Sequence, residues 1–120
     1  MSLYYAQEKA YEVLLGLGSK DQSLAERLGA AVTGSFRDLV AEVGREQSGL
    51  HLGLVRDLVT LFDEIQSLQP ENESFENISV TISALDASAV ASYTEQIVLF
   101  CVETLQARGE DAWLLGTNRD

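Results

Sequence analysis

Hydrophobic residues recur along this chain at the three- and four-residue spacing of amphipathic helices. The clearest case is the segment 50–68, in which Leu54, Leu58 and Leu61 begin a stripe that Ile65 continues. The same periodicity predicts five helical segments in all. They cover residues 3–17, 20–46, 50–68, 75–85 and the stretch from Asp86 to about 108, with Asp86 as an N-cap and Gly109 as the C-terminal stop.

The second segment carries several glycines, which weaken a helix. Gly29, Gly34 and Gly44 each cost about 1 kcal/mol relative to alanine. They mark either a kink or a place where another helix crosses closely. The pattern Ser19-Lys20-Asp21-Gln22 resembles a capping box, so we expect this helix to begin directly after Ser19.

Residues 75–85 fit two structures. Ile78 and Ile82 have helical spacing, whereas Ile78, Val80 and Ile82 also alternate with polar residues as in a strand. A strand needs a neighbour, and no second strand-like run exists in the sequence. We therefore predict a helix here, and a lone strand could pair only with a second copy or another partner.

The last segment contains a run, residues 97–102, that is apolar on every side. Such a helix is central in its domain or lies at a subunit interface. We predict one all-α domain, a compact bundle of four to five helices that forms a homodimer. The tail carries Trp113-Leu114-Leu115, which we expect to dock back on the bundle because it would otherwise expose an apolar patch.

Charge is distributed very unevenly. The net charge is −11, and no lysine or arginine occurs between Arg56 and Arg108. That stretch holds nine acids: Asp57, Asp63, Glu64, Glu71, Glu73, Glu76, Asp86, Glu95 and Glu103. Such a field repels nucleic acid and anionic membranes and attracts basic partners. Solubility alone also accounts for acidity, but it does not require the exclusion of every basic residue from so long a stretch.

Few residues suggest catalysis or metal binding. His51 is the only histidine, so we interpret it as an exposed or capping residue at a helix start, and Cys101, inside the apolar run, as a core cysteine. The residue types of a catalytic triad occur at Ser48, His51 and Asp57, but the sequence has no nucleophile-elbow pattern around the serine. We predict no catalytic residue, no metal and no cofactor.

The leading hypothesis is a non-catalytic interaction module that binds a basic protein, as an immunity protein, inhibitor or chaperone does. Six carboxylates would speed and orient the encounter, and two apolar residues would anchor the complex. The predicted binding residues are Asp57, Asp63, Glu64, Glu71, Glu73, Glu76, Trp113 and Leu114.

Three other classes stay open. Carboxylates spaced like phosphates would make the chain a DNA mimic that inhibits a nucleic-acid-binding protein. A small helical enzyme would hold a metal with Glu42, Glu46, Asp63 and Glu64, although we interpret Glu42 and Glu46 as one solvated helix face. A purely structural subunit would self-associate. The first residues lack a signal-peptide pattern and no apolar run reaches about 20 residues, so we expect a cytoplasmic protein.

Overall fold

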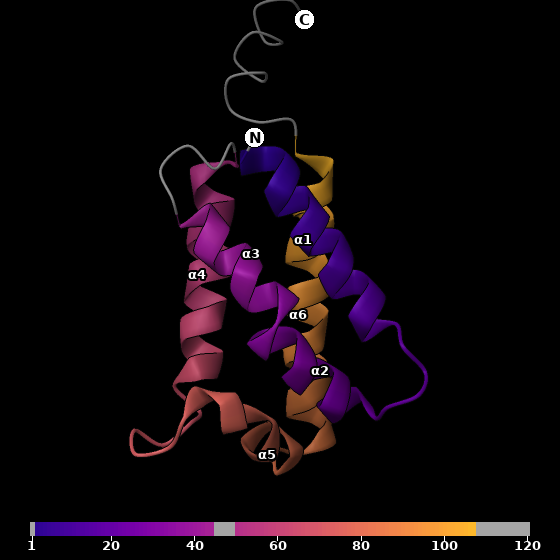
Figure 1. Ribbon diagram of the computed structural model, residues 1–120, viewed down its shortest axis with the longest axis vertical. Helices are drawn as coiled ribbons and strands as arrows, with labels where there is room; N and C mark the ends of the chain where they lie inside the picture. Colours follow the sequence, from indigo (N-terminus) through magenta and orange to yellow (C-terminus); the bar gives the residue numbers. More distant parts are fainter. Residues whose placement is uncertain (1, 45–49, 108–120) are drawn as a thin grey trace, which may run out of the picture.

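A computed structural model describes residues 2–44 and 50–107 of the chain, and this part is built from helices (Figure 1). The helices are α1 (Ser2–Leu17), α2 (Leu24–Thr33), α3 (Ser35–Val43), α4 (Leu52–Gln66), the short 3₁₀ helix η1 (Phe75–Asn77), α5 (Ile78–Ser83) and α6 (Ala87–Gln106). No strand occurs among the described residues. The prediction of a compact all-α fold is confirmed.

The helices surround a common core. Figure 1 shows α1 and α4 on two sides of the molecule, α2 and α3 in front, and α6 behind them. Packing agrees with this view, because α6 contacts α1, α2 and α4, while α3 contacts α1 and α4. The short helix α5 lies at one end, against α2. The end of α4 therefore leads into the connection that returns through η1 and α5 to α6.

The predicted second helix is two helices in the structure. Helix α2 ends at Thr33 and α3 begins at Ser35, so the single helix predicted over 20–46 is wrong. Gly34 separates them with φ −123° and ψ −110°, outside the helical region. A Cβ atom at Gly34 would lie only 3.0 Å from the carbonyl oxygen of Ala30. The glycine that the pattern marked as a kink is thus a complete break.

The predicted capping box is also misplaced. The structure forms it at Ser23, whose Oγ accepts a hydrogen bond from Glu26 N–H (3.2 Å) while the Glu26 carboxylate accepts one from Ser23 N–H (2.9 Å). Ser19 instead accepts a bond from Asp21 N–H within the α1–α2 turn. Both serines have an acid or amide three residues later. Only the second directly precedes the apolar residues that α2 buries, such as Leu28.

Gly29 permits the close helix crossing expected from the small residues of this region. It lies on α2 where α5 packs, and a Cβ atom there would approach Ser79 Cα to 3.1 Å and its hydroxyl more closely still. Residues 75–85 are helical as predicted, with a 3₁₀ first turn. Ile78 and Ile82 are buried, while Val80 is 74 % exposed. Strand alternation would have placed all three on one face.

Helix α6 begins as the sequence predicted, but it lies at the side of the bundle and not at its centre. Asp86 caps it, its Oδ1 accepting a hydrogen bond from Ala89 N–H at 2.8 Å. Ile97 and Cys101 are completely buried, so α6 supplies one wall of the core. The opposite side is exposed, however, and Leu99 is 56 % accessible. Helix α6 ends at Gln106, before the predicted end at about 108, and its C-cap Ala107 is extended. Gly109 and the predicted docking of Trp113-Leu114-Leu115 lie outside the described residues.

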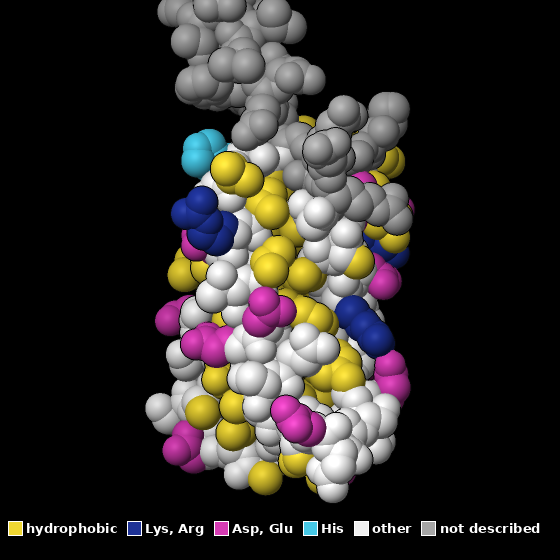
Figure 2. Space-filling model, turned by 90° about the vertical axis from the view of Figure 1, so that its left-hand side faces the viewer, with side chains coloured by type: hydrophobic (Ala, Val, Ile, Leu, Met, Phe, Trp, Pro, Cys, Tyr) yellow, Lys and Arg dark blue, Asp and Glu magenta, His cyan; other side chains and the backbone are white. Residues whose placement is uncertain are grey.

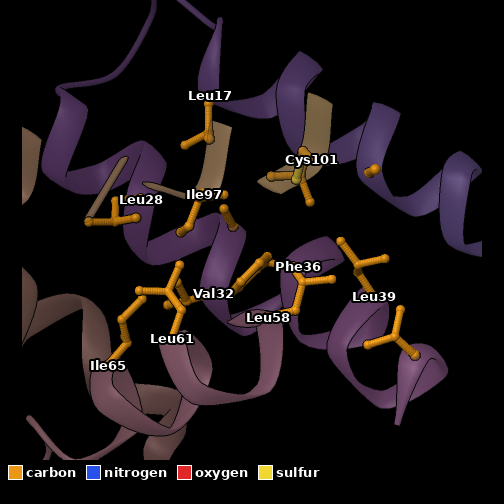
Figure 3. Close-up of a cluster of buried hydrophobic side chains, with 14 of the residues drawn as sticks. Leu17, Leu28, Val32, Phe36, Leu39, Leu58, Leu61, Ile65, Ile97 and Cys101 are labelled. Carbon is orange, nitrogen blue, oxygen red and sulfur yellow. The ribbon is translucent and has the colours of Figure 1, made fainter. Parts of the chain in front are cut away.

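The core is a continuous cluster of aliphatic side chains and one phenylalanine (Figure 3). Leu28, Val32 and Phe36 from α2 and α3 face Leu58, Leu61 and Ile65 from α4, and Ile97 and Cys101 from α6 complete it. The ring of Phe36 lies 6.1 Å from that of Phe62, which in turn meets Phe75 edge-on at 5.5 Å. A row of aromatic rings therefore connects the core to η1 at the end of the bundle.

Helix α1 has two distinct flanks. A hydrogen bond to Glu12 is the main reason that the pKa of Lys9 is raised, and the carboxylate of Asp38 on α3 adds to it. Lys9, with its partner Glu12, lies on one flank of the helix. Gln7, roughly 160° away around the helix, donates from Nε2 to the carbonyl oxygens of Thr104 and Ala107. The start of α1 is therefore fixed beside the end of α6.

Candidate functional site

A hollow with several carboxylates lies at the C-terminal end of α4. Its volume is about 470 Å³. Three of the six acids predicted from the sequence, Asp63, Glu71 and Glu73, line it together. The other lining residues are uncharged, and they are Gln66, Ser67, Gln69, Pro70 and Phe75. The structure thus brings an acid from a helix together with two acids from the following connection.

Hydrogen bonds hold the connection that forms this hollow. Gln69 is central, because its Nε2 donates to the carbonyl oxygen of Ser74 at 2.8 Å and its Oε1 accepts from the hydroxyl of Thr81. Glu73 N–H donates to the Pro70 carbonyl at 3.0 Å. The Ser74 hydroxyl then accepts from Glu76 N–H and starts η1. These bonds define the backbone that carries Glu71 and Glu73.

An arginine that the sequence analysis did not select lies beside this region. Arg37 of α3 places its guanidinium 5.4 Å from the centroid of the Phe75 ring, and its Nη1 lies 2.6 Å from Glu76 Oε2. Glu76 is therefore paired with a cation, whereas the three carboxylates that line the hollow form no ion pair within the described residues. Arg37 lies 39 residues before Glu76 in the sequence. Counting the charges of the acidic stretch therefore does not show that an arginine lies beside it in the fold.

The other predicted acids occupy different sides of α4. Asp57 lines a second hollow of about 470 Å³ with His51, Leu54 and Glu103, at the opposite end of the helix. Glu64 is exposed, and one residue along a helix corresponds to a rotation of about 100° from Asp63. The predicted cluster is thus partly assembled. Trp113 and Leu114 lie outside the described residues.

The histidine and the cysteine have the roles expected of them. His51 is the N-cap of α4, its Nδ1 accepting a hydrogen bond from Gly53 N–H at 3.0 Å. Cys101 is inaccessible, and burial raises its pKa to about 12. A thiol in that state is protonated at neutral pH and is a poor nucleophile. Ser48 lies outside the described residues, so the triad drawn on paper has no described nucleophile.

The carboxylates proposed for a metal are not gathered in the described ranges. Glu42 is only 6 % exposed, which makes the interpretation of a solvated face wrong for this residue; Glu46 lies outside the described residues. Asp63 and Glu64 are exposed on α4. Within residues 2–44 and 50–107, no group of three or more histidine, cysteine or acidic side chains has an arrangement that could hold a metal ion.

Acidic side chains are dispersed over the visible surface. On the face shown in Figure 2 they stand apart from one another, with hydrophobic and uncharged polar atoms between them. The described helices include none that is long and apolar enough to cross a membrane. A search among family models, curated proteins and solved structures gives no match to this chain.

Proposed function

We propose that this protein is a non-catalytic interaction module that binds a basic surface of another protein. The observation that supports it is the hollow at the end of α4, where Asp63, Glu71 and Glu73 surround apolar groups of Pro70 and Phe75. Lysine and arginine side chains combine an aliphatic stem with a charged head. A site for one of them needs apolar contact and carboxylate oxygens within the same small volume.

The charge of the region suits such a partner. The three carboxylates are exposed, so they act at long range on an approaching cation. Rim charges of this kind mainly raise the association rate and fix orientation. Phe75 is held by contacts to Phe62 and Arg37, so its ring offers a fixed surface to an incoming side chain. The partner's binding should weaken as salt rises.

The test is affinity capture from a native lysate with the wild type and a triple variant as bait. The variant D63N/E71Q/E73Q removes the carboxylates of the hollow and changes the net charge from −11 to −8, because three acids become amides. Washes at about 50 mM and about 500 mM salt, followed by mass spectrometry, identify what remains. We expect a basic protein that the wild type retains at low salt and the triple variant loses.

A matched control separates position from total charge. The variant D21N/D38N/E103Q also has a net charge of −8, and its three exposed acids lie away from the hollow. Retention of the basic protein by this control supports the site. Equal retention by all three baits would disprove the proposed role of the hollow, and equal loss from both triple variants would reduce the effect to unspecific charge.

Two further parts of the proposal concern location and assembly. We propose a cytoplasmic protein, and the single buried thiol of Cys101, which forms no disulfide, is in keeping with a reducing compartment. We also propose a homodimer. Support for it comes from the apolar side of α6 that the described bundle leaves exposed.

A further inference from the structure

Seven large apolar residues on α1 and α6 remain exposed in the bundle. One of them, Tyr5, has the ammonium group of Lys9 over its ring on another flank of α1, and the other six share the outer side. On α1 they are Tyr4, Tyr11 and Leu15, which are 71 %, 56 % and 59 % accessible; on α6 they are Leu99, Val102 and Leu105, at 56 %, 37 % and 36 %. We call this set the α1–α6 outer face. The exposure of these apolar side chains is notable because the opposite sides of the same two helices are completely buried, as at Ala10 and Ile97.

The three residues of α1 share the flank toward α6. Gln7, which reaches the end of α6, is three residues after Tyr4 and four before Tyr11, so all three follow one side of the helix. Lys9 is on the other flank, roughly 160° from Gln7 around the helix. Leu15 continues the row one turn beyond Tyr11.

The three residues of α6 look away from the core and from α4. Glu103 lines the hollow that α4 shares with α6, and Leu105 lies roughly 160° from Glu103 around the helix. Leu99 and Val102 lie between them on the outward side. The beginning of α1 meets the end of α6, and the two helices run in opposite directions in contact with each other (Figure 1), so the two exposed rows belong to adjoining helices.

We propose that the α1–α6 outer face is the surface on which a second copy of this chain docks. From the exposures above and side-chain areas of about 150–250 Å², the six residues expose on the order of 600 Å². That area lies at the upper end of the range of about 300–600 Å² that the largest apolar patch of a typical monomer covers. With the polar residues around it, the face approaches the roughly 800 Å² that each partner buries in a standard interface.

A two-helix layer is well suited to pairing with its own copy. Two antiparallel helices packed against the same two helices of a second copy form a four-helix arrangement, related by a two-fold axis. Glu8 and Glu95 lie within the two exposed rows, and the hydroxyls of Tyr4 and Tyr11 are donors that carboxylates accept. No lysine or arginine occurs in either row, so the copies approach with like charge.

Charge therefore gives the two proposed interactions opposite salt dependence. Each copy carries −11, and screening reduces their repulsion, so dimerisation should tighten as salt rises. Binding of a basic protein at the hollow should weaken over the same range. This inference rests on the proposed homodimer and not on the basic partner. Failure of the dimer would therefore leave the proposed basic partner intact, because that proposal is tested separately by affinity capture.

The test is sedimentation equilibrium of the full chain over about 1–100 µM, at about 50 and 500 mM salt. The chain has a mass of 13.1 kDa, and we expect the wild type to approach twice this value. The variants L15K and L99K each place a charge in the outer face at an exposed position. We expect each to raise the dimer Kd on the order of 100-fold.

The matched control is V80K. Val80 of α5 is 74 % exposed and lies outside the face, so its dimer Kd should stay unchanged. Circular dichroism and melting curves show whether the variants fold. A wild type that stays monomeric at 100 µM in high salt would overturn the proposal and leave the face to another protein or to residues beyond 107. Dimers that persist in folded L15K and L99K would overturn it too.

Discussion

Arg37 and Glu76 form an ion pair with 2.6 Å between Nη1 and Oε2, and the same guanidinium lies over the ring of Phe75. The pair joins α3 to η1 across 39 residues. It also brings a positive charge from outside the purely acidic stretch to the edge of the acidic hollow. The arginine thus has two expected effects, a small one on stability and a larger one on binding.

Replacing Arg37 by glutamine should lower the free energy of unfolding by less than about 1 kcal/mol, because both side chains are substantially exposed. The same change should speed association with a basic partner, since it frees Glu76 and makes the net charge −12. Urea denaturation measures the first effect and stopped-flow mixing the second. The control R56Q changes charge equally on α4; a rate gain confined to R56Q would contradict the prediction.

Gly29 is a packing position that alanine cannot occupy without movement. In G29A the new methyl group would meet Ser79, including its backbone, so we expect a loss of about 1–3 kcal/mol. The matched substitution is G16A, on the exposed side of α1 with nothing within 4 Å, which should gain about 0.5–1 kcal/mol. Thermal or urea unfolding compares them. Similar effects in both variants would show that α5 does not pack on α2 as described.

The thiol of Cys101 should react only when the protein opens. Burial raises its pKa to about 12, well above the value of 9.0 for a free thiol. As pH rises, the Cys101 thiol therefore loses its proton in the unfolded chain before it does in the folded one. The free energy of unfolding should then fall as pH rises above about 9. A thiol-reactive disulfide reagent at about pH 8 should label native protein far more slowly than protein in guanidinium. Rapid complete labelling of the native state would rule out this burial.

Glu26 should make the start of α2 sensitive to acid. Its pKa is lowered, first by the hydrogen bond from the backbone of Ser23 and then by the Ser23 side chain. A group with a depressed folded pKa stabilises above its unfolded value, here 4.5, and this contribution is lost as pH falls through the folded value. Melting curves of wild type and E26Q should differ most near pH 6 and converge toward pH 3. A constant difference would refute this reasoning.

Much of the fold follows from periodicity alone. The stripe of α4 and the Asp86 cap of α6 are local features, and both are present as predicted. The sequence analysis did not predict the break between α2 and α3. A glycine inside a helical pattern weakens the helix, but the pattern is the same whether the helix continues or ends there. The choice between Ser19 and Ser23 as cap depends on which apolar residues become buried, a tertiary property.

The candidate site was predicted less completely, for a physical reason. Asp63, Glu71 and Glu73 are close in sequence, so a short connection was enough to bring them together. Asp57 and Glu64 are on the same helix as Asp63 but on a different face of it. Counting charges along the sequence does not distinguish the faces of a helix. Arg37 reaches the site only through the packing of α3 against α4. Contacts between distant segments need the three-dimensional structure.

The side chain of Gln69 has a further consequence. Its amide is used at both ends, by Ser74 through nitrogen and by Thr81 through oxygen, so it can take only one orientation. The connection around the hollow is therefore shaped before any partner arrives. A ligand would meet a prepared surface and lose little free energy in ordering it, so the speed of recognition would be set by diffusion and charge and not by rearrangement of the loop.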